Sequence, residues 1–126
     1  MHGRHTFPKS EHLRYGHEFR GLYRDGRRAE GSRIVLYARE WNPAETPAPG
    51  PVRRLGVVTS RRVGNAVARN RARRLMREVY RLNKHKLKDH VELIMIARPS
   101  IKGKSYQEVE SDALRLFRAA AILREP

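Results

Sequence analysis

Hydrophobic and polar positions follow two different periods along the chain, and these periods predict which segments are strands and which are helices. Residues 33–40 and 53–60 are rich in β-branched, aromatic and other apolar side chains, which is typical of strands. Residues 89–98 form a nearly continuous apolar run, as expected of a central strand that is covered on both faces. We therefore expect three strands, with the second antiparallel to the first across the loop that joins them.

The first and last helices are predicted from apolar residues that recur at helical spacing. Within residues 16–26, Phe19 and Tyr23 lie one turn apart. Near the C-terminus, Ser105 and Glu108 have the spacing of a capping box, which marks the start of a helix. Its apolar stripe continues through Val109, Ala113, Leu116, Ala120 and Leu123.

A third helix, between the second and third predicted strands, has an unusual polar side. Residues 61–81 read RRVGNAVARNRARRLMREVYR. Apolar residues step by three and four along one stripe, with Met76 beside them: Ala68, Ala72, Leu75, Val79 and Leu82. A turn of about 100° per residue places the following polar residues on the opposite side, with Arg71 at the border: Arg69, Asn70, Arg73, Arg74, Arg77 and Arg81.

The order of the elements is helix, strand, strand, helix, strand, helix. It predicts the α+β class, as an α–β sandwich in which helices pack on a small mixed sheet. The length of 126 residues suits a single domain, residues 1–126. Within it we expect residues 1–15 to be mobile and residues 41–52 to form a proline-rich loop.

Composition narrows the classes of partner. Lys and Arg total 28 against 13 Asp and Glu, which gives a net charge of +15. Such a balance is typical of proteins that bind nucleic acids, membrane surfaces or other polyanions. The chain has no cysteine, so a disulfide framework and a thiolate metal site are both excluded. No apolar run approaches the roughly 18 residues of a membrane span, and a soluble cytoplasmic protein is the simplest interpretation.

The arginine-rich side of the middle helix has two interpretations. It could be a solvated surface, but such surfaces mix both signs of charge, and here Glu78 is the one acid within residues 61–81. The planar guanidinium fork also suits phosphate groups. We therefore expect nucleic-acid phosphates to supply the balancing charge.

Three aromatic residues form a second candidate site. In the predicted strand, Tyr37 points to the same side as Val35 and to the side opposite Ile34. We therefore expect one sheet face to carry an aromatic patch together with Phe19 and Tyr23. Aromatic side chains in a basic surface can stack unpaired bases. The alternative is that they are core residues, which is the better interpretation for Phe19 taken alone.

No group in the sequence is arranged for catalysis or for binding a metal ion. The six histidines are scattered, and the carboxylates are few and dispersed, so neither a ligand cluster nor a pair of acids for two-metal hydrolysis is predicted. We expect no catalytic residue and no metal ligand in this chain.

The arginine-rich segment resembles the signature of the bacterial ribonuclease P protein family. That signature has a basic pair, Gly-x-Ala-Val, Arg-Asn, a second basic pair and a further arginine. The matching residues are Arg61, Arg62, Gly64, Ala66, Val67, Arg69, Asn70, Arg73, Arg74 and Arg77. The resemblance extends along the chain, because the segments EFRGLYRDGRR, RIVLYARE, RRLGVVTSRR, LIMIARPS and SYQEVESDALRLF occur in the family's order.

The resemblance implies a fold and a function. The fold is an α–β sandwich with a left-handed βαβ crossover at the arginine-rich helix, contrary to the usual hand. The function is that of one subunit of a ribonucleoprotein that removes the 5′ leader from precursor tRNA. The catalytic centre then lies in the RNA, and Mg²⁺ is held mainly by RNA and substrate, with none bound by this chain. The implied partners are ribonuclease P RNA and precursor tRNA, with no membrane and no required protein partner.

The resemblance also implies site residues. A cleft between the first helix and the sheet would hold the single-stranded leader, lined by Phe19, Tyr23 and Tyr37. Tyr23 stands where some members have Phe, which keeps a stacking face, and Gly16 replaces a polar helix cap. The RNA-facing positions would be Arg61, Arg62, Asn65, Arg69, Asn70, Arg71, Arg73, Arg74 and Arg77.

Three other classes compete with this interpretation. A stand-alone RNA-binding protein, such as a ribosomal protein, fits the composition but gives no reason for the aromatic residues beside the Arg-Asn segment. A protein nuclease would need clustered carboxylates or a histidine pair. A DNA-binding helix-turn-helix is the weakest, because the basic helix is flanked by strands.

Overall fold

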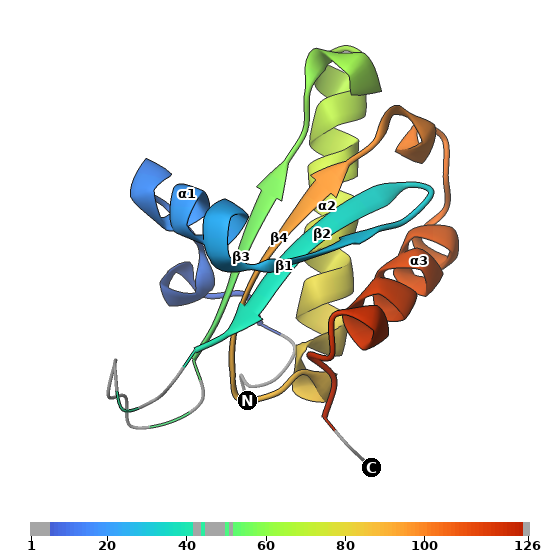
Figure 1. Ribbon diagram of the computed structural model, residues 1–126. Helices are drawn as coiled ribbons and strands as arrows, with labels where there is room; N and C mark the ends of the chain where they lie inside the picture. Colours follow the sequence, from blue (N-terminus) through green and yellow to red (C-terminus); the bar gives the residue numbers. More distant parts are fainter. Residues whose placement is uncertain (1–5, 42–43, 45–49, 51, 125–126) are drawn as a thin grey trace.

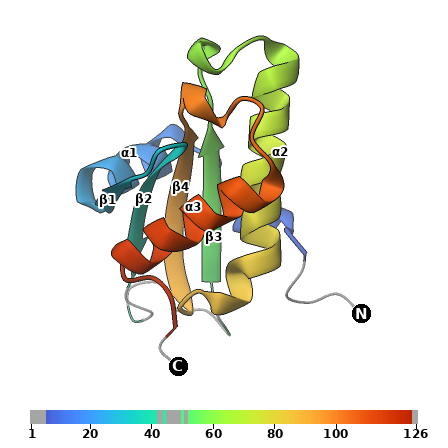
Figure 2. The same cartoon turned by 90° about the vertical axis from the view of Figure 1, so that its right-hand side faces the viewer.

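The computed structural model describes residues 6–41, 44, 50 and 52–124. A four-stranded sheet lies between two layers of helices, with α2 and α3 on one face and α1 on the other (Figures 1 and 2). The elements are α1 (Gly16–Asp25), β1 (Arg27–Glu30), β2 (Ile34–Glu40), β3 (Val52–Val58), α2 (Ala66–Asn83), β4 (His90–Ala97) and α3 (Tyr106–Ala119). Short 3₁₀ turns occur at Lys9–Glu11, Arg61–Val63, Lys84–Lys86 and Pro99–Ile101.

The sheet is mixed and has the strand order β1-β2-β4-β3. Strand β4 pairs antiparallel with β2 and parallel with β3. In Figure 1, α2 passes behind the sheet while the chain moves from β3 on the left to β4 on the right, so the β3–α2–β4 crossover is left-handed. The predicted α+β sandwich with a mixed sheet is confirmed.

Two details of the predicted sheet need correction. Strands β2 and β3 run in opposite directions, as expected, but they are not paired because β4 lies between them. Strand β1, with the sequence RRAE, was not predicted. It is a short, mostly exposed edge strand that pairs with β2, and its side chains give no apolar alternation that would mark a strand.

The main core lies between the sheet and the helices α2 and α3. Strand β2 shows the expected alternation, because Ile34 and Leu36 are buried and Val35 and Tyr37 are only half-buried. The buried stripe of α2 is rotated from the predicted one. It consists of Ala72, Met76, Val79, Tyr80 and Asn83, whereas Ala68, Leu75 and Leu82 are half-buried.

The N-terminal segment, which we expect to be mobile, is described in part. Residues 1–5 lie outside the described part of the chain, but residues 6–15 pack on the edge of β3 and on α2. Leu13 is buried, and its amide donates to the Leu55 carbonyl at 3.0 Å. Much of the predicted proline-rich loop, at 42–43, 45–49 and 51, also lies outside the described residues.

Candidate nucleic-acid interface

The turn that leads into α2 is built by residues of the predicted signature. Gly64 has a φ of 142°, and a Cβ at this position would lie 2.9 Å from the Cβ of Ala68, so a side chain is excluded both by conformation and by space. The Asn65 side chain then caps α2 by accepting a hydrogen bond from the Ala68 amide at 3.0 Å. This arrangement leaves Arg61 and Arg62 exposed at the end of the molecule.

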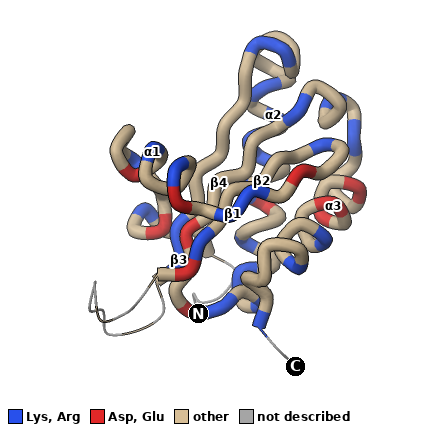
Figure 3. Tube along the Cα trace, in the orientation of Figure 1, with Lys and Arg blue, Asp and Glu red and all other residues tan. Residues whose placement is uncertain are grey.

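The outer side of α2 carries arginines that the chain does not neutralise. Arg74 and Arg77 are exposed, and neither makes an ion pair with any other described residue. Arg73 donates to the Asn70 side chain at 2.8 Å, which orients its guanidinium without cancelling its charge. Basic positions recur along α2 and the turn before it, whereas α3 also carries acidic positions (Figure 3). We call Arg69, Asn70, Arg73, Arg74 and Arg77 the arginine face.

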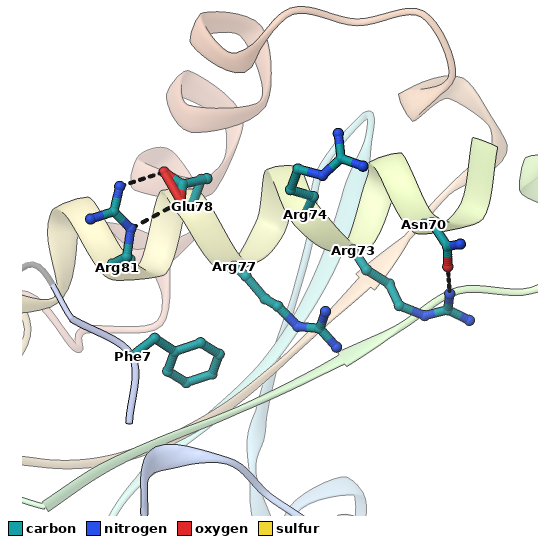
Figure 4. Close-up of a pocket in the computed structure, with 7 residues that line it drawn as sticks. All are labelled: Phe7, Asn70, Arg73, Arg74, Arg77, Glu78 and Arg81. Atoms are coloured by element: carbon teal, nitrogen blue, oxygen red, sulfur yellow. Dashed lines mark hydrogen bonds and ion pairs between the residues drawn. The ribbon is translucent and has the colours of Figure 1, made fainter. Parts of the chain in front are cut away.

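A hollow of about 520 Å³ opens along this face. Its lining consists of Phe7, Asn70, Arg73, Arg74, Arg77, Glu78 and Arg81. Arg73 and Arg77 extend toward the side on which Phe7 lies, whereas Arg74 points away from it (Figure 4). Arg81 is held at one end by two hydrogen bonds to Glu78, of 2.9 and 2.7 Å, and this contact lowers the pKa of the Glu78 carboxyl.

Two other predicted RNA-facing residues are engaged within the chain. Arg71 donates to the Lys104 carbonyl at 2.7 Å, and Asn65 caps the helix. Arg69 is half-buried, and its Nε has no hydrogen-bond partner among the described residues. The structure thus brings Asn70, Arg73, Arg74 and Arg77 together around one hollow and places Arg61 and Arg62 beyond the start of the helix.

The aromatic residues Phe19, Tyr23 and Tyr37, which we call the aromatic patch, lie on the side of the sheet that α1 covers. The rings of Tyr23 and Tyr37 pack edge to face with centroids 4.9 Å apart. The Phe19 ring lies so close to β3 that a Cβ at Gly56 would be 2.6 Å from it. Tyr23 is 39% exposed, and partial burial, together with Tyr37, raises the pKa of its phenol.

Ion pairs hold α1 in place beside the aromatic patch. Arg54 of β3 contacts Glu18 of α1 at 2.9 Å. Arg39 of β2 contacts Glu92 at 3.1 Å and Asp25 of α1 at 3.4 Å. Burial acts to raise the pKa of Glu18, but hydrogen bonds from the Tyr15 and Arg14 amides and the charge of Arg54 outweigh it, so the pKa lies below its usual value.

The carboxylates near the aromatic patch are paired with arginines. Glu18, Asp25 and Glu92 are each engaged by an arginine side chain. Within the described part of the chain, no group of three or more His, Asp or Glu residues could hold a metal ion. The same part of the chain contains no helix that is long and apolar enough to cross a bilayer.

Sequence reasoning missed two residues of this region, Phe7 and Glu11. Glu11 accepts hydrogen bonds from the Tyr80 hydroxyl at 2.5 Å and from the Lys84 ammonium at 2.8 Å. The partners are 69 and 73 residues away in the sequence, so no local spacing reveals them. The aromatic Phe7 beside a proline in an otherwise polar segment was the one available signal.

Comparisons with known proteins agree with this geometry. The sequence model of the family Ribonuclease P matches residues 7–121. The ribonuclease P protein component of Clostridium novyi is 36% identical over 115 residues, covering 90% of this chain and 96% of that protein. The corresponding protein of Dictyoglomus thermophilum is 35% identical over 126 residues, covering 98% of each chain.

Solved structures have the same fold. The RNase P protein of Staphylococcus aureus superposes with a TM-score of 0.78 at 23% identity, covering 92% of this chain and all of that chain. The protein from Thermotoga maritima gives a TM-score of 0.70 at 25% identity, covering 86% and 96%. The family model and the sequence relatives favour the ribonuclease P interpretation over a ribosomal protein. The chain belongs to the ribonuclease P protein family, and it is the protein subunit of the ribonucleoprotein endoribonuclease that contains ribonuclease P RNA and processes the 5′ end of tRNA.

Proposed function

We propose that this subunit uses two separate surfaces to hold its RNA partners. The arginine face of α2, with Arg61 and Arg62, binds phosphates of ribonuclease P RNA. The aromatic patch under α1 contacts the unpaired 5′ leader of precursor tRNA. The chain thereby positions the leader relative to the catalytic RNA, and it supplies no catalytic group of its own.

The observation that carries this proposal is the unpaired charge on a well-anchored helix. Met76, Val79 and Tyr80 fix α2 on the sheet with no measurable exposure, while Arg74 and Arg77 project outward without an acidic partner among the described residues. Each guanidinium that contacts a phosphate releases condensed counterions, which makes such binding favourable and dependent on salt.

The proposed role in catalysis is electrostatic. Folding of the catalytic RNA and docking of the substrate both bring polyanions together, and cations must offset the resulting repulsion. We infer that Mg²⁺ held by RNA and substrate does part of this work, and that the arginines of this chain do the rest. No further protein partner is needed for this role, and the cytoplasm, where its RNA partners are made, is the expected site of action.

The leader contact is tested by comparing precursor and mature tRNA. Tyr23→Ala should weaken binding of precursor tRNA to the reconstituted holoenzyme by about 1–3 kcal/mol, the value of one base stacked on an aromatic ring. Binding of mature tRNA, which lacks the leader, should not change. Tyr23 is the best position because it is the most exposed of the three aromatic residues.

Tyr15→Ala is the matched control. Tyr15 is 60% exposed at the start of the same helix but stacks on His17 rather than on the aromatic patch. Phe19→Ala is less informative, because removing a packed phenylalanine costs up to about 3–5 kcal/mol of folding stability. An equal loss of affinity for both forms of tRNA, with an unchanged thermal melt, would assign the aromatic patch a purely structural role.

A further inference from the structure

The N-terminal segment, residues 6–15, lies beside the arginine face and is held there by contacts with the rest of the chain. Glu11 ties the segment to α2 through Tyr80 and Lys84, and Leu13 ties it to the edge of β3. Lys84 is 5% exposed, so its ammonium group is almost fully removed from water and is paired with Glu11. These contacts position the residues that precede them.

Phe7 is the residue that this segment presents to the hollow. His12 stacks against one face of its ring, with centroids 3.8 Å apart and planes inclined by 11°. The Tyr80 ring lies 5.1 Å away at a tilt of 59°. Phe7 remains half-buried and lines the hollow across from the α2 side chains (Figure 4). An aromatic ring thus stands opposite Arg73 and Arg77 at a fixed place.

This pairing of a ring with guanidinium groups differs from a simple phosphate-binding surface. A helical ridge of arginines that bound only the backbone of a duplex would need no aromatic group facing it. Single-stranded nucleic acids are instead bound where basic groups follow the backbone and aromatic rings stack the bases. The volume of about 520 Å³ falls within the range of about 300–1,000 Å³ that is typical of sites for small ligands.

We propose that the hollow between Phe7 and α2 binds an unpaired nucleotide of RNA, whose base stacks on Phe7 and whose flanking phosphates contact Arg73 and Arg77. The Glu78–Arg81 pair closes one end of this site, and its carboxylate offers an acceptor to amino groups of the base. Because Phe7 is held in place before RNA arrives, stacking requires little further ordering of the chain. This inference rests on the proposed function of the arginine face and adds the N-terminal segment to it.

A smaller hollow of about 90 Å³ lies next to this site, beside β3. Phe7 and Arg77 line both hollows, and Phe19 of the aromatic patch lines the smaller one. The smaller hollow therefore lies between the proposed nucleotide site and the aromatic patch. Its nucleotide could come from ribonuclease P RNA or from the leader of precursor tRNA, and the two sources share the same chemistry.

The test uses the full chain with Phe7→Leu, which keeps an apolar side chain against Tyr80 but removes the stacking face. Phe7→Tyr is the conservative variant, and Tyr15→Leu is the control for loss of an aromatic residue outside the hollow. One arm measures binding of each protein to ribonuclease P RNA as a function of salt. The other arm measures binding of precursor and mature tRNA to the reconstituted holoenzymes.

Phe7→Leu should lose about 5- to 150-fold in affinity in one of these arms, as expected for one stacked base. A loss in the first arm assigns the nucleotide to ribonuclease P RNA, and a loss confined to precursor tRNA assigns it to the leader. The salt dependence should stay unchanged for Phe7→Leu, whereas Arg77→Gln should reduce its slope by about one. The affinity of Phe7→Tyr should lie within about threefold of the wild-type affinity. The affinity of Tyr15→Leu should equal that of the wild type.

A folded Phe7→Leu protein with wild-type affinity in both arms would overturn the inference. If Arg77→Gln still weakened binding, the proposed role of the arginine face would stand; if Arg77→Gln were also silent, that role would fail as well. Should Phe7→Leu not fold, Phe7→Trp in a Trp41→Phe background decides the question. A stacked base must quench the new indole and shield it from acrylamide, and an indole that RNA leaves unquenched and unshielded would contradict the proposal.

Discussion

The helices α2 and α3 lie on the same face of the sheet, yet their outer sides differ. Each buries an apolar stripe, with Met76 and Val79 on α2 and Val109 and Phe117 on α3. Over its whole length α2 carries six arginines and one acid, whereas α3 carries two arginines and three acids. Packing on the sheet therefore requires the stripe but not the arginines, and the excess charge of α2 must serve another purpose.

Two of the three acids of α3, Asp112 and Glu110, make contacts within the chain. Asp112 is fully buried and accepts hydrogen bonds from the Arg33 amide, at 2.9 Å, and from Arg115. Glu110 accepts from the Asn83 side chain at 2.8 Å and from the Tyr106 hydroxyl at 2.6 Å. Asp112 and Glu110 thus stabilise the fold, whereas Arg74 and Arg77 of α2 have no acidic partner among the described residues and are, in our proposal, balanced by RNA phosphates.

The largest expected effects concern the stripe that the two helices share. Met76→Ala should lower the free energy of unfolding by about 2–5 kcal/mol and Phe117→Ala by about 3–5 kcal/mol, because both side chains are fully buried. Denaturant unfolding of each variant measures these losses. If either variant kept wild-type stability, the view that both helices support the fold through their buried stripes would be wrong.

The outer sides should respond differently from the stripes. Arg77→Ala should weaken binding to ribonuclease P RNA by about 1–3 kcal/mol, the scale of a lost charge-assisted contact, and should lower the salt slope by about one. Arg118→Ala on the exposed side of α3 should change neither quantity. Filter binding at several salt concentrations provides both measurements.

Arg118 is a better control than Arg115, because Arg115 pairs with the buried Asp112. Replacing Arg115 would deprive the buried Asp112 carboxylate of one partner and would destabilise the fold. Equal losses of RNA affinity from Arg77→Ala and Arg118→Ala would show that overall charge, not the arginine face, determines binding.

The smallest expected effect lies at the contact between the two helices. Hydrogen bonds from Asn83 and Tyr106 lower the pKa of Glu110 below its ordinary value of 4.5. A carboxyl whose pKa is lowered by folding stabilises the protein above its unfolded pKa, and this contribution is lost as the pH falls through the folded pKa. Glu110→Gln should therefore cost about 1 kcal/mol or less at pH 7 and should reduce the loss of stability on acidification below about pH 4.5.

Thermal melts at several pH values measure this effect, with Glu108→Gln as the control. Glu108 is an exposed acid in the first turn of the same helix, so Glu108→Gln makes the same change of charge without touching the contact to Asn83. If Glu110→Gln lost as much stability as the wild type at acidic pH, the Glu110 carboxyl would not contribute to the contact between α2 and α3.

Local sequence patterns predicted the elements better than their partners. Periodicity identified the helices and the three longer strands, and the segment RNRARR located the arginine face. It did not show that β4 would insert between β2 and β3, because strand neighbours are determined by contacts between distant segments. The short, charged β1 lacked any strand pattern.

The site was predicted unevenly for the same reason. Arg73, Arg74 and Arg77 share one side of a helix whose geometry follows from the sequence. The position of Phe7 depends on contacts of Glu11 with Tyr80 on α2 and with Lys84 just after it, and no nearby residue indicates these contacts. The Phe19 ring similarly depends on the absence of a side chain at Gly56.

The central claim is that the arginine face supplies positive charge which magnesium would otherwise have to provide. The most direct test is the rate of precursor-tRNA cleavage against magnesium concentration. Two samples contain ribonuclease P RNA alone or the chain alone. Three further samples contain the RNA together with the wild-type chain, the Arg73→Ala and Arg77→Ala double variant, or the Arg118→Ala variant.

The wild-type chain and Arg118→Ala should shift the magnesium requirement of the RNA to lower concentrations, and the double variant should lose much of that shift. At high magnesium concentration, all samples that contain the RNA should cleave precursor tRNA at similar rates. The chain alone should cleave nothing. A double variant that lowered the magnesium requirement as well as the wild type would contradict the account, as would specific 5′ cleavage by RNA-free protein.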